Sequence, residues 1–173
     1  MKAVLISIRP KWCELVASGK KMVEVRKTKP KIETPFKVYI YETQGRTETP
    51  FVDEEGHHIF KGRGQVIGEF VCRRIDTYPY NKNGYGIAEE HLLCTLSCIE
   101  EKELYHYLQG SKPYAWNISD LVIYGKPRSI GEFCKPCDPD PQCDCQYCMT
   151  HGRSPSMTIK RAPQSWCYVE ERR

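Results

Sequence analysis

The sequence predicts an α+β fold in which short helices flank a small mixed β-barrel. Three observations lead to this prediction. A strand–helix–strand unit occupies residues 3–26, strongly alternating segments follow at 36–42 and 64–75, and two more strand-like segments come after a pair of short helical patterns. With 173 residues the chain is long enough to bury a proper core, and we expect residues 1–173 to form a single domain.

Turn and periodicity signals define the opening unit. Residues 3–8 form an apolar strand that leads to Pro10, whose fixed φ suits the first position of a helix. Gly19 then supplies a left-handed stop for that helix. The apolar stripe of the helix has helical spacing and consists of Trp12, Leu15 and Val16.

The second strand, residues 22–26, alternates cleanly between apolar and polar side chains. Its valines share one face, so Glu24 and Arg26 lie side by side on the other face. By the same rule, Ser7 and Arg9 share a face of the first strand. We therefore expect polar groups from two strands to meet near one end of the helix.

Positive charge is concentrated in the same region. Residues 9–31 carry eight basic and two acidic side chains, whereas the whole chain has a net charge of only +4. A local basic patch attracts phosphates, and aromatic neighbours make it better suited to single-stranded nucleic acid than to a duplex groove. The alternative is a solvated lysine-rich face with no ligand.

The middle of the chain contains two strands joined by a long loop. Residues 36–42 alternate as a half-buried strand does, and residues 43–63 are turn-rich and charged, which is typical of a hairpin loop or flap. Within that loop His57 and His58 would point apart on an extended chain, which disfavours a shared metal site. Residues 64–75 form a strong strand, in which two glycines indicate a bulge or a close backbone contact.

Two short helices and two strands complete the predicted fold. The first helix covers residues 87–94. The second begins at Ser97, which opens a Ser-x-x-Glu capping box, and ends at Gly110. Residues 114–124 and 164–170 supply the last two long strands.

Arg9-Pro10 and the GKKMVEVR run of residues 19–26 form a pattern of a strand end, a helix and a charged strand. They resemble the opening of an ASCH domain, the activating-signal-cointegrator homology group of the PUA-like superfamily, in its bacterial or phage type. Residues 64–75, 114–124 and 163–170 resemble the remaining strands of such a domain. The resemblance implies a PUA-like pseudobarrel that binds RNA or a nucleotide in a basic cleft between the first helix and the barrel.

The residues that we expect to bind this ligand are Ser7, Arg9, Lys11, Lys21, Glu24, Arg26, Lys27, Trp116 and Ser165. Two interpretations of the tryptophans stay open. Trp116 and Trp166 could stack on bases beside the cleft, or they could pack in the core, which is the usual place of a strand tryptophan. Glu24 and Arg26 could likewise brace the cleft as an ion pair or orient a ligand phosphate.

A second hypothesis is catalysis. A few proteins of this superfamily resemble small hydrolases that remove acyl groups from modified cytidine with a lysine, a threonine and a downstream glutamate. Lys21 matches that lysine, Glu24 stands where the threonine is expected, and Glu89 or Glu90 could be the downstream carboxylate. A lysine in a cationic site can act as a base or nucleophile, and Glu24 could then shuttle protons.

Ten cysteines in a chain without a secretion signal argue for reduced thiols and metal binding, and we expect a cytoplasmic protein. Two Cys-x-x-Cys pairs in an insert at 134–151 predict a structural zinc site. The expected ligands are Cys134, Cys137, Cys145 and Cys148, and Cys143 or His151 could replace one of them. The alternative to the zinc site is a metal-free loop. A third hypothesis for the function of the protein is a zinc-stabilised protein-interaction adaptor. The cysteines outside the insert suit small core positions: Cys13, Cys72, Cys94, Cys98 and Cys167.

No apolar run approaches 18 residues, and 40% of the residues are hydrophobic, so we expect no membrane-spanning helix. The first residues, MKAVLISIRP, have no small-residue cleavage site. They read as a first strand and not as a signal peptide.

Overall fold

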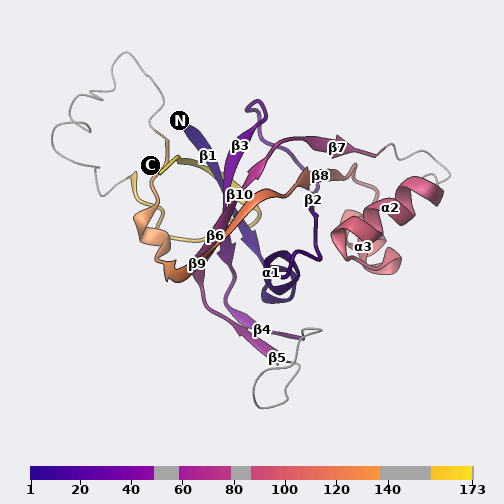
Figure 1. Cartoon of the computed structure of the whole chain (residues 1–173), viewed down its shortest axis with the longest axis horizontal. Coiled ribbons are helices and arrows are strands. Elements are labelled where there is room, and N and C mark those ends of the chain that lie inside the picture. Colours follow the sequence, from indigo (N-terminus) through magenta and orange to yellow (C-terminus); the bar gives the residue numbers. More distant parts are fainter. Residues whose placement is uncertain (49–58, 79–86, 137–156, 173) are drawn as a thin grey trace.

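The structure is a computed structural model and describes residues 1–48, 59–78, 87–136 and 157–172 (Figure 1). A five-stranded mixed sheet contains β1 (Lys2–Ile8), β3 (Phe36–Glu42), β6 (Gln65–Cys72), β9 (Ser119–Arg128) and β10 (Trp166–Glu170). Its strand order is β10-β1-β3-β6-β9. Strand β1 pairs in parallel with β3 and antiparallel with β10, so the first strand of the chain lies inside the sheet.

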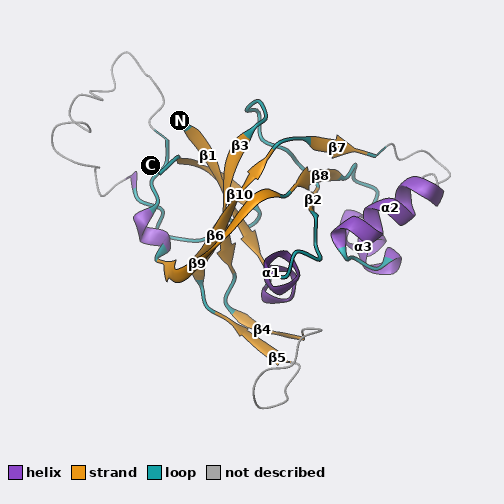
Figure 2. Ribbon diagram, in the orientation of Figure 1, coloured by secondary structure: helices purple, strands orange, loops and turns teal. Residues whose placement is uncertain are grey.

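A smaller sheet and three helices lie beside the large sheet (Figure 2). The small sheet has the order β2-β8-β7 and contains β2 (Val23–Arg26), β7 (Ile75–Thr77) and β8 (Tyr114–Asn117). The helices are α1 (Pro10–Ala17), α2 (Ile87–Ser97) and α3 (Glu101–Leu108). A short 3-10 turn, η1 (Ile130–Glu132), follows β9.

Each sheet has its own apolar packing. One face of the large sheet packs β1 and β3 residues such as Val4 and Val38 against Trp116, and the other packs Leu5 and Tyr39 against the chain after β9. The small sheet packs against α2 and α3 through Val23, Val25, Ala115, Leu93, Leu104 and Leu108. The prediction that residues 36–42 are half-buried was therefore wrong, because β3 is a central strand covered on both faces.

The α+β class is confirmed, but the closed barrel is not. In the described part of the chain the strands form separate sheets with open edges. The predicted strand at 114–124 is in fact two strands, since β8 belongs to the small sheet and β9 to the large one. Asp120 has a positive φ of 48° just after the break, which turns the chain from one sheet into the other.

The boundary between the two late helices also differs from the prediction. Helix α2 continues to Ser97, and α3 begins only at Glu101, because Cys98 takes a left-handed conformation with φ of 55° that interrupts the helix. Ser97 is thus the last residue of α2 and caps no helix. The predicted end of the second helix is confirmed, since Gln109 and Gly110 both have positive φ.

Residues 43–63 were expected to form a hairpin loop or a flap, and the described part of this segment contains two paired strands. Strands β4 (Gly45–Glu48) and β5 (Ile59–Gly62) pair antiparallel and extend from the end of the large sheet (Figure 1). His57 and His58 lie outside the described residues. Among the described residues no helix is long and apolar enough to cross a membrane.

Gly68 of β6 marks both features predicted from the strand glycines, a bulge and a close backbone contact. The register between β6 and β9 shifts beside Gly68. A Cβ at this position would collide with the backbone carbonyl of Val122 in the neighbouring strand. The side chain of any other residue would therefore push the two strands apart.

We expect Gly68→Ala to lower the free energy of unfolding by about 1–3 kcal/mol, the usual cost of overpacking against atoms that cannot move away. Chemical denaturation measures the loss. Gly125→Ala is the matched control, since Gly125 lies in the partner strand β9 with open space around the added carbon. That control should change stability by less than about 0.5 kcal/mol. Equal effects of the two substitutions would contradict the close approach of β6 and β9.

Candidate ligand-binding cavity

A cavity of about 910 Å³ opens where the end of β1, helix α1, strand β2 and helix α3 meet the segment before β10. Helix α1 contributes the ring of Trp12, and the other elements contribute polar side chains. The lining residues are Ser7, Ile8, Arg9, Trp12, Lys21, Glu24, Val25, Arg26, Lys27, Thr28, Thr43, Ile99, Glu103, His106, Tyr107, Pro163, Gln164 and Ser165.

Seven of the nine predicted binding residues line this cavity: Ser7, Arg9, Lys21, Glu24, Arg26, Lys27 and Ser165. Lys11 and Trp116 do not line it. The Nζ of Lys11 lies 3.5 Å from the Oε2 of Glu103, an ion pair that links α1 to α3. The expectation for Trp116 was wrong, because its indole is fully buried between Phe36 and Trp166, with ring centroids 5.9 Å from each.

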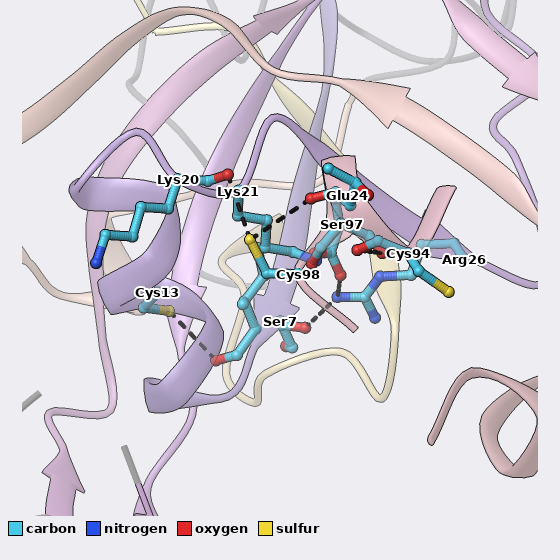
Figure 3. Close-up of polar contacts among 11 residues, drawn as sticks. Ser7, Cys13, Lys20, Lys21, Glu24, Arg26, Cys94, Ser97 and Cys98 are labelled. Carbon is cyan, nitrogen blue, oxygen red and sulfur yellow. Dashed lines mark hydrogen bonds and ion pairs between the residues drawn. The ribbon is translucent and has the colours of Figure 1, made fainter. Parts of the chain in front are cut away.

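Buried charges form one side of the cavity (Figure 3). Glu24 Oε1 lies 2.9 Å from Nη2 of Arg26, and Glu24 Oε2 lies 3.4 Å from Nζ of Lys21. All three residues are at most 8% exposed. One carboxylate thus separates two cations, and the group carries a net charge of +1 in its ionised form.

The two cations use their remaining donors to hold other parts of the chain. Lys21 Nζ donates a hydrogen bond of 2.7 Å to the carbonyl of Ser97, the last residue of α2 before the turn to α3. Arg26 donates a hydrogen bond of 2.6 Å to the carbonyl of Ser7 and another of 3.3 Å to the hydroxyl of Ser165. The charged group therefore connects β1, β2, the α2–α3 turn and the segment before β10.

Local sequence explains how these residues reach the cavity. Arg9 is extended, and Pro10 begins α1 immediately after it, so the Arg9 side chain stays at the mouth. Gly19 has φ of 73° and ends α1, after which the amide of Lys21 donates to the carbonyl of Leu15. This tight return places Lys21 and Glu24 directly beside the helix.

Burial lowers the pKa of Lys21 below its ordinary value, and the attraction of Glu24 opposes that shift only in part. The Lys21 ammonium also lies 4.9 Å from the ring centre of Trp12, which Lys11 approaches at 4.5 Å. Such cation–π contacts favour the charged form of a lysine. Lys21 is thus a cation held with little water around it.

Helix α3 supplies three lining residues that the sequence analysis missed. Glu103, His106 and Tyr107 have i, i+3, i+4 spacing and share the face toward the cavity. Leu104 and Leu108 form the buried side of α3, and its polar face was not assigned to the site from the sequence. The i, i+3, i+4 spacing of Glu103, His106 and Tyr107 is the sequence signal that could have identified this polar face as part of the site. Burial raises the pKa of Tyr107.

Of the two downstream carboxylates proposed for hydrolysis, Glu90 does not meet the other site residues. Glu90 does not line the cavity and accepts a hydrogen bond of 3.2 Å from the hydroxyl of Tyr105 on α3. Nothing is described of the side chain of Glu89. The second carboxylate of the cavity is instead Glu103.

The zinc hypothesis stays a prediction, because all of its proposed ligands except Cys134 lie outside the described residues: Cys137, Cys143, Cys145, Cys148 and His151. Cys134 is buried and forms a β-bridge with Thr158. No group of three potential metal ligands occurs in the described ranges. Of the other cysteines, Cys13 and Cys72 are buried as predicted, and burial raises the pKa of Cys72 to about 12.

With this geometry the fold can be compared with known proteins. The sequence matches the ASCH domain family over residues 6–123, more than half of the chain, and the protein belongs to that family. No curated protein matches it. The ASCH protein of Zymomonas mobilis is a similar solved structure, with 18% identity, a TM-score of 0.58 and coverage of 98% of this chain and 88% of that one.

Two substituted forms of the Zymomonas mobilis protein are similar as well. A tyrosine-to-phenylalanine mutant gives a TM-score of 0.53 at 18% identity, covering 99% of this chain and 92% of its own. A serine-to-alanine mutant gives a TM-score of 0.54 at 17% identity, and the match covers 98% of this chain and 89% of the mutant chain. At such identities the likeness establishes the fold and leaves the function to be argued from the cavity.

The paired charges at the cavity should dominate stability. We expect Glu24→Gln to lower the free energy of unfolding by about 3–5 kcal/mol, because two buried cations then lose their counter-charge. Asp120→Asn is the control, since the Arg73–Asp120 pair is more than half exposed and asparagine tolerates positive φ. The control should cost less than about 1 kcal/mol in denaturant titrations. A loss at Glu24 no larger than the control would refute the central position of this carboxylate.

Proposed function

We propose that this ASCH domain binds RNA or a nucleotide in the cavity, with phosphate groups near Arg9 and Lys27. The observation that carries the proposal is the charge of the lining. Four lining residues are Lys or Arg and two are Glu, and the buried group at its side keeps a net positive charge. An anionic ligand would meet cations whose positions are already fixed by the fold.

Arg9 and Lys27 are the phosphate contacts that we favour. Arg9 is exposed and Lys27 half-buried, and neither has an ion-pair partner among the described residues. Lys21 and Arg26 differ from them, since both are buried and already donate to Glu24 and to backbone carbonyls, although Nε of Arg26 has no partner in the described part of the chain. The buried cations therefore set the field and shape of the cavity, and the rim cations are free to bind phosphate.

The remaining lining suits a nucleoside. Hydroxyl and amide groups of Thr28, Thr43 and Gln164 offer donors and acceptors for a base edge or a sugar. Trp12 and Tyr107 contribute apolar ring surface, although lysines already lie over both rings. Polar groups, rings and cations are the combination found where single-stranded nucleic acid is bound.

The rim cations can be tested by salt dependence. We expect the double variant Arg9→Gln/Lys27→Gln to bind an eight-nucleotide RNA more weakly and to flatten the plot of log affinity against log salt by about 1.4, since each phosphate contact on a single strand contributes roughly 0.7. Fluorescence anisotropy at several salt concentrations measures both quantities.

The control for this experiment is Lys126→Gln/Lys135→Gln, which removes the same charge from exposed positions that do not line the cavity. It should leave the slope unchanged. If both double variants flatten the slope equally, the RNA is attracted by overall charge and not by the cavity rim.

Hydrolysis of a modified nucleoside is the second candidate, and the lowered pKa of Lys21 favours it. A buried lysine beside Glu24 could act as a base toward an acyl group that reaches the cavity. Incubation with a panel of acylated nucleosides, followed by chromatography, tests this. Turnover that disappears in Lys21→Met, with folding checked by circular dichroism, would support an enzyme. Absence of turnover alongside RNA binding would support the binding function alone.

A further inference from the structure

The connector after β2, residues 27–31, lies along a row of aromatic rings. Four residues of the connector each contact a different ring through a cation–π contact or a hydrogen bond. We call these four rings the aromatic row: Tyr107, Trp166, Tyr114 and Tyr168.

The contacts follow the order of the chain. Lys27 Nζ lies 5.3 Å from the Tyr107 ring centre, and the indole of Trp166 donates a hydrogen bond of 3.0 Å to the hydroxyl of Thr28. Lys29 Nζ then lies 5.9 Å from the ring centre of Tyr114. At the end of the connector, the backbone amide of Lys31 donates a hydrogen bond of 2.6 Å to the hydroxyl of Tyr168.

The row is continuous with the cavity. Lys27, Thr28 and Tyr107 line the cavity and also belong to the connector or the row. Ser165, another lining residue, immediately precedes Trp166 in the chain. The aromatic row therefore begins at the cavity lining.

The rings are held firmly but are not fully covered. Trp166, Tyr168 and Tyr114 are partly buried and pack against the core of the large sheet. Trp166 and Tyr168 meet edge to face, with centroids 5.4 Å apart. Fixed rings with accessible surface are what base stacking needs, because little entropy is lost when a base arrives.

Positive charge accompanies the rings. Lys29, Lys31 and Lys112 are exposed, and no ion-pair partner is seen for them among the described residues. Glu33 is the acidic residue next along the chain. A strand of nucleic acid lying on the row would place its phosphates beside these lysines.

We propose that the aromatic row is an extended binding track for single-stranded RNA, which leaves the cavity and stacks successive bases on Trp166 and Tyr168. The inference rests on the proposed function and makes it narrower, since it selects a strand of RNA over a free nucleotide. Partly exposed rings with lysines beside them suit unpaired bases, whereas a duplex keeps its bases stacked on each other.

The same contacts could serve only to brace the connector, and Tyr168 separates the two roles. Tyr168→Phe removes the hydroxyl that holds Lys31 but keeps the ring, whereas Tyr168→Leu removes both. A brace needs the hydroxyl. A stacking platform needs the ring.

The experiment measures affinity for labelled oligouridylates of one, two, four and eight nucleotides by fluorescence anisotropy. We expect affinity to rise up to about four nucleotides, the lower end of known single-strand site sizes. Tyr168→Leu should weaken binding of the four-nucleotide RNA about 5- to 150-fold, the range for one stacked base, with the single nucleotide unaffected. Tyr168→Phe should stay within about twofold of the wild type, because a phenyl ring still stacks.

The double variant Lys29→Gln/Lys31→Gln tests the track independently. It should flatten the salt dependence of the affinity for the longer RNAs, whereas the control Lys126→Gln/Lys135→Gln should not. Equal losses in Tyr168→Phe and Tyr168→Leu would overturn the track and leave a brace. If the single nucleotide binds and added length brings no gain, the track fails and the proposed function stands. If no length binds, both fail.

Discussion

The carboxylate of Glu24, buried between Lys21 and Arg26, is the interaction on which the rest of this structure depends. A buried charge is tolerated only when it is paired and hydrogen-bonded, so none of the three residues can move independently. Alternation in the four-residue strand β2 places Glu24 and Arg26 on one face, and the tight return after α1 brings Lys21 beside them. A very short piece of sequence thus sets the most constrained part of the molecule.

This constraint also organises distant segments. Because Lys21 and Arg26 have donors left after pairing with Glu24, they hold the carbonyls of Ser97 and Ser7. The helical pair α2–α3 and the end of β1 are thereby fixed against β2. The cavity is the space that remains between these segments, and the side chains that hold its walls contribute part of its net positive charge, together with Arg9 and Lys27. One arrangement of charges therefore supports the fold and makes this side of the cavity positive.

Local patterns predicted the parts of the site that lie close together in sequence. The strand–helix–strand unit identified Ser7, Arg9, Glu24 and Arg26 as neighbours, because strand alternation and a short helix leave little freedom. The contribution of α3 depends on how two helices dock on the small sheet, which no short-range pattern encodes. Trp116 shows the same limit. It lies in β8 opposite Glu24, and the sequence alone is compatible with a place in a cleft or in the core. The packing of the large sheet against it decides for the core.

The central claim is that the cavity beside Glu24 is where a nucleotide binds. The most direct measurement is an NMR titration of the labelled protein with uridine 5′-monophosphate. Our account predicts that backbone amides of Thr28, Tyr107 and Gln164, which line the cavity, shift in a saturable way, while those of Val122 and Ile123 on the exposed edge strand β9 stay unchanged. Saturable shifts confined to β9, or none at the cavity residues, would contradict it.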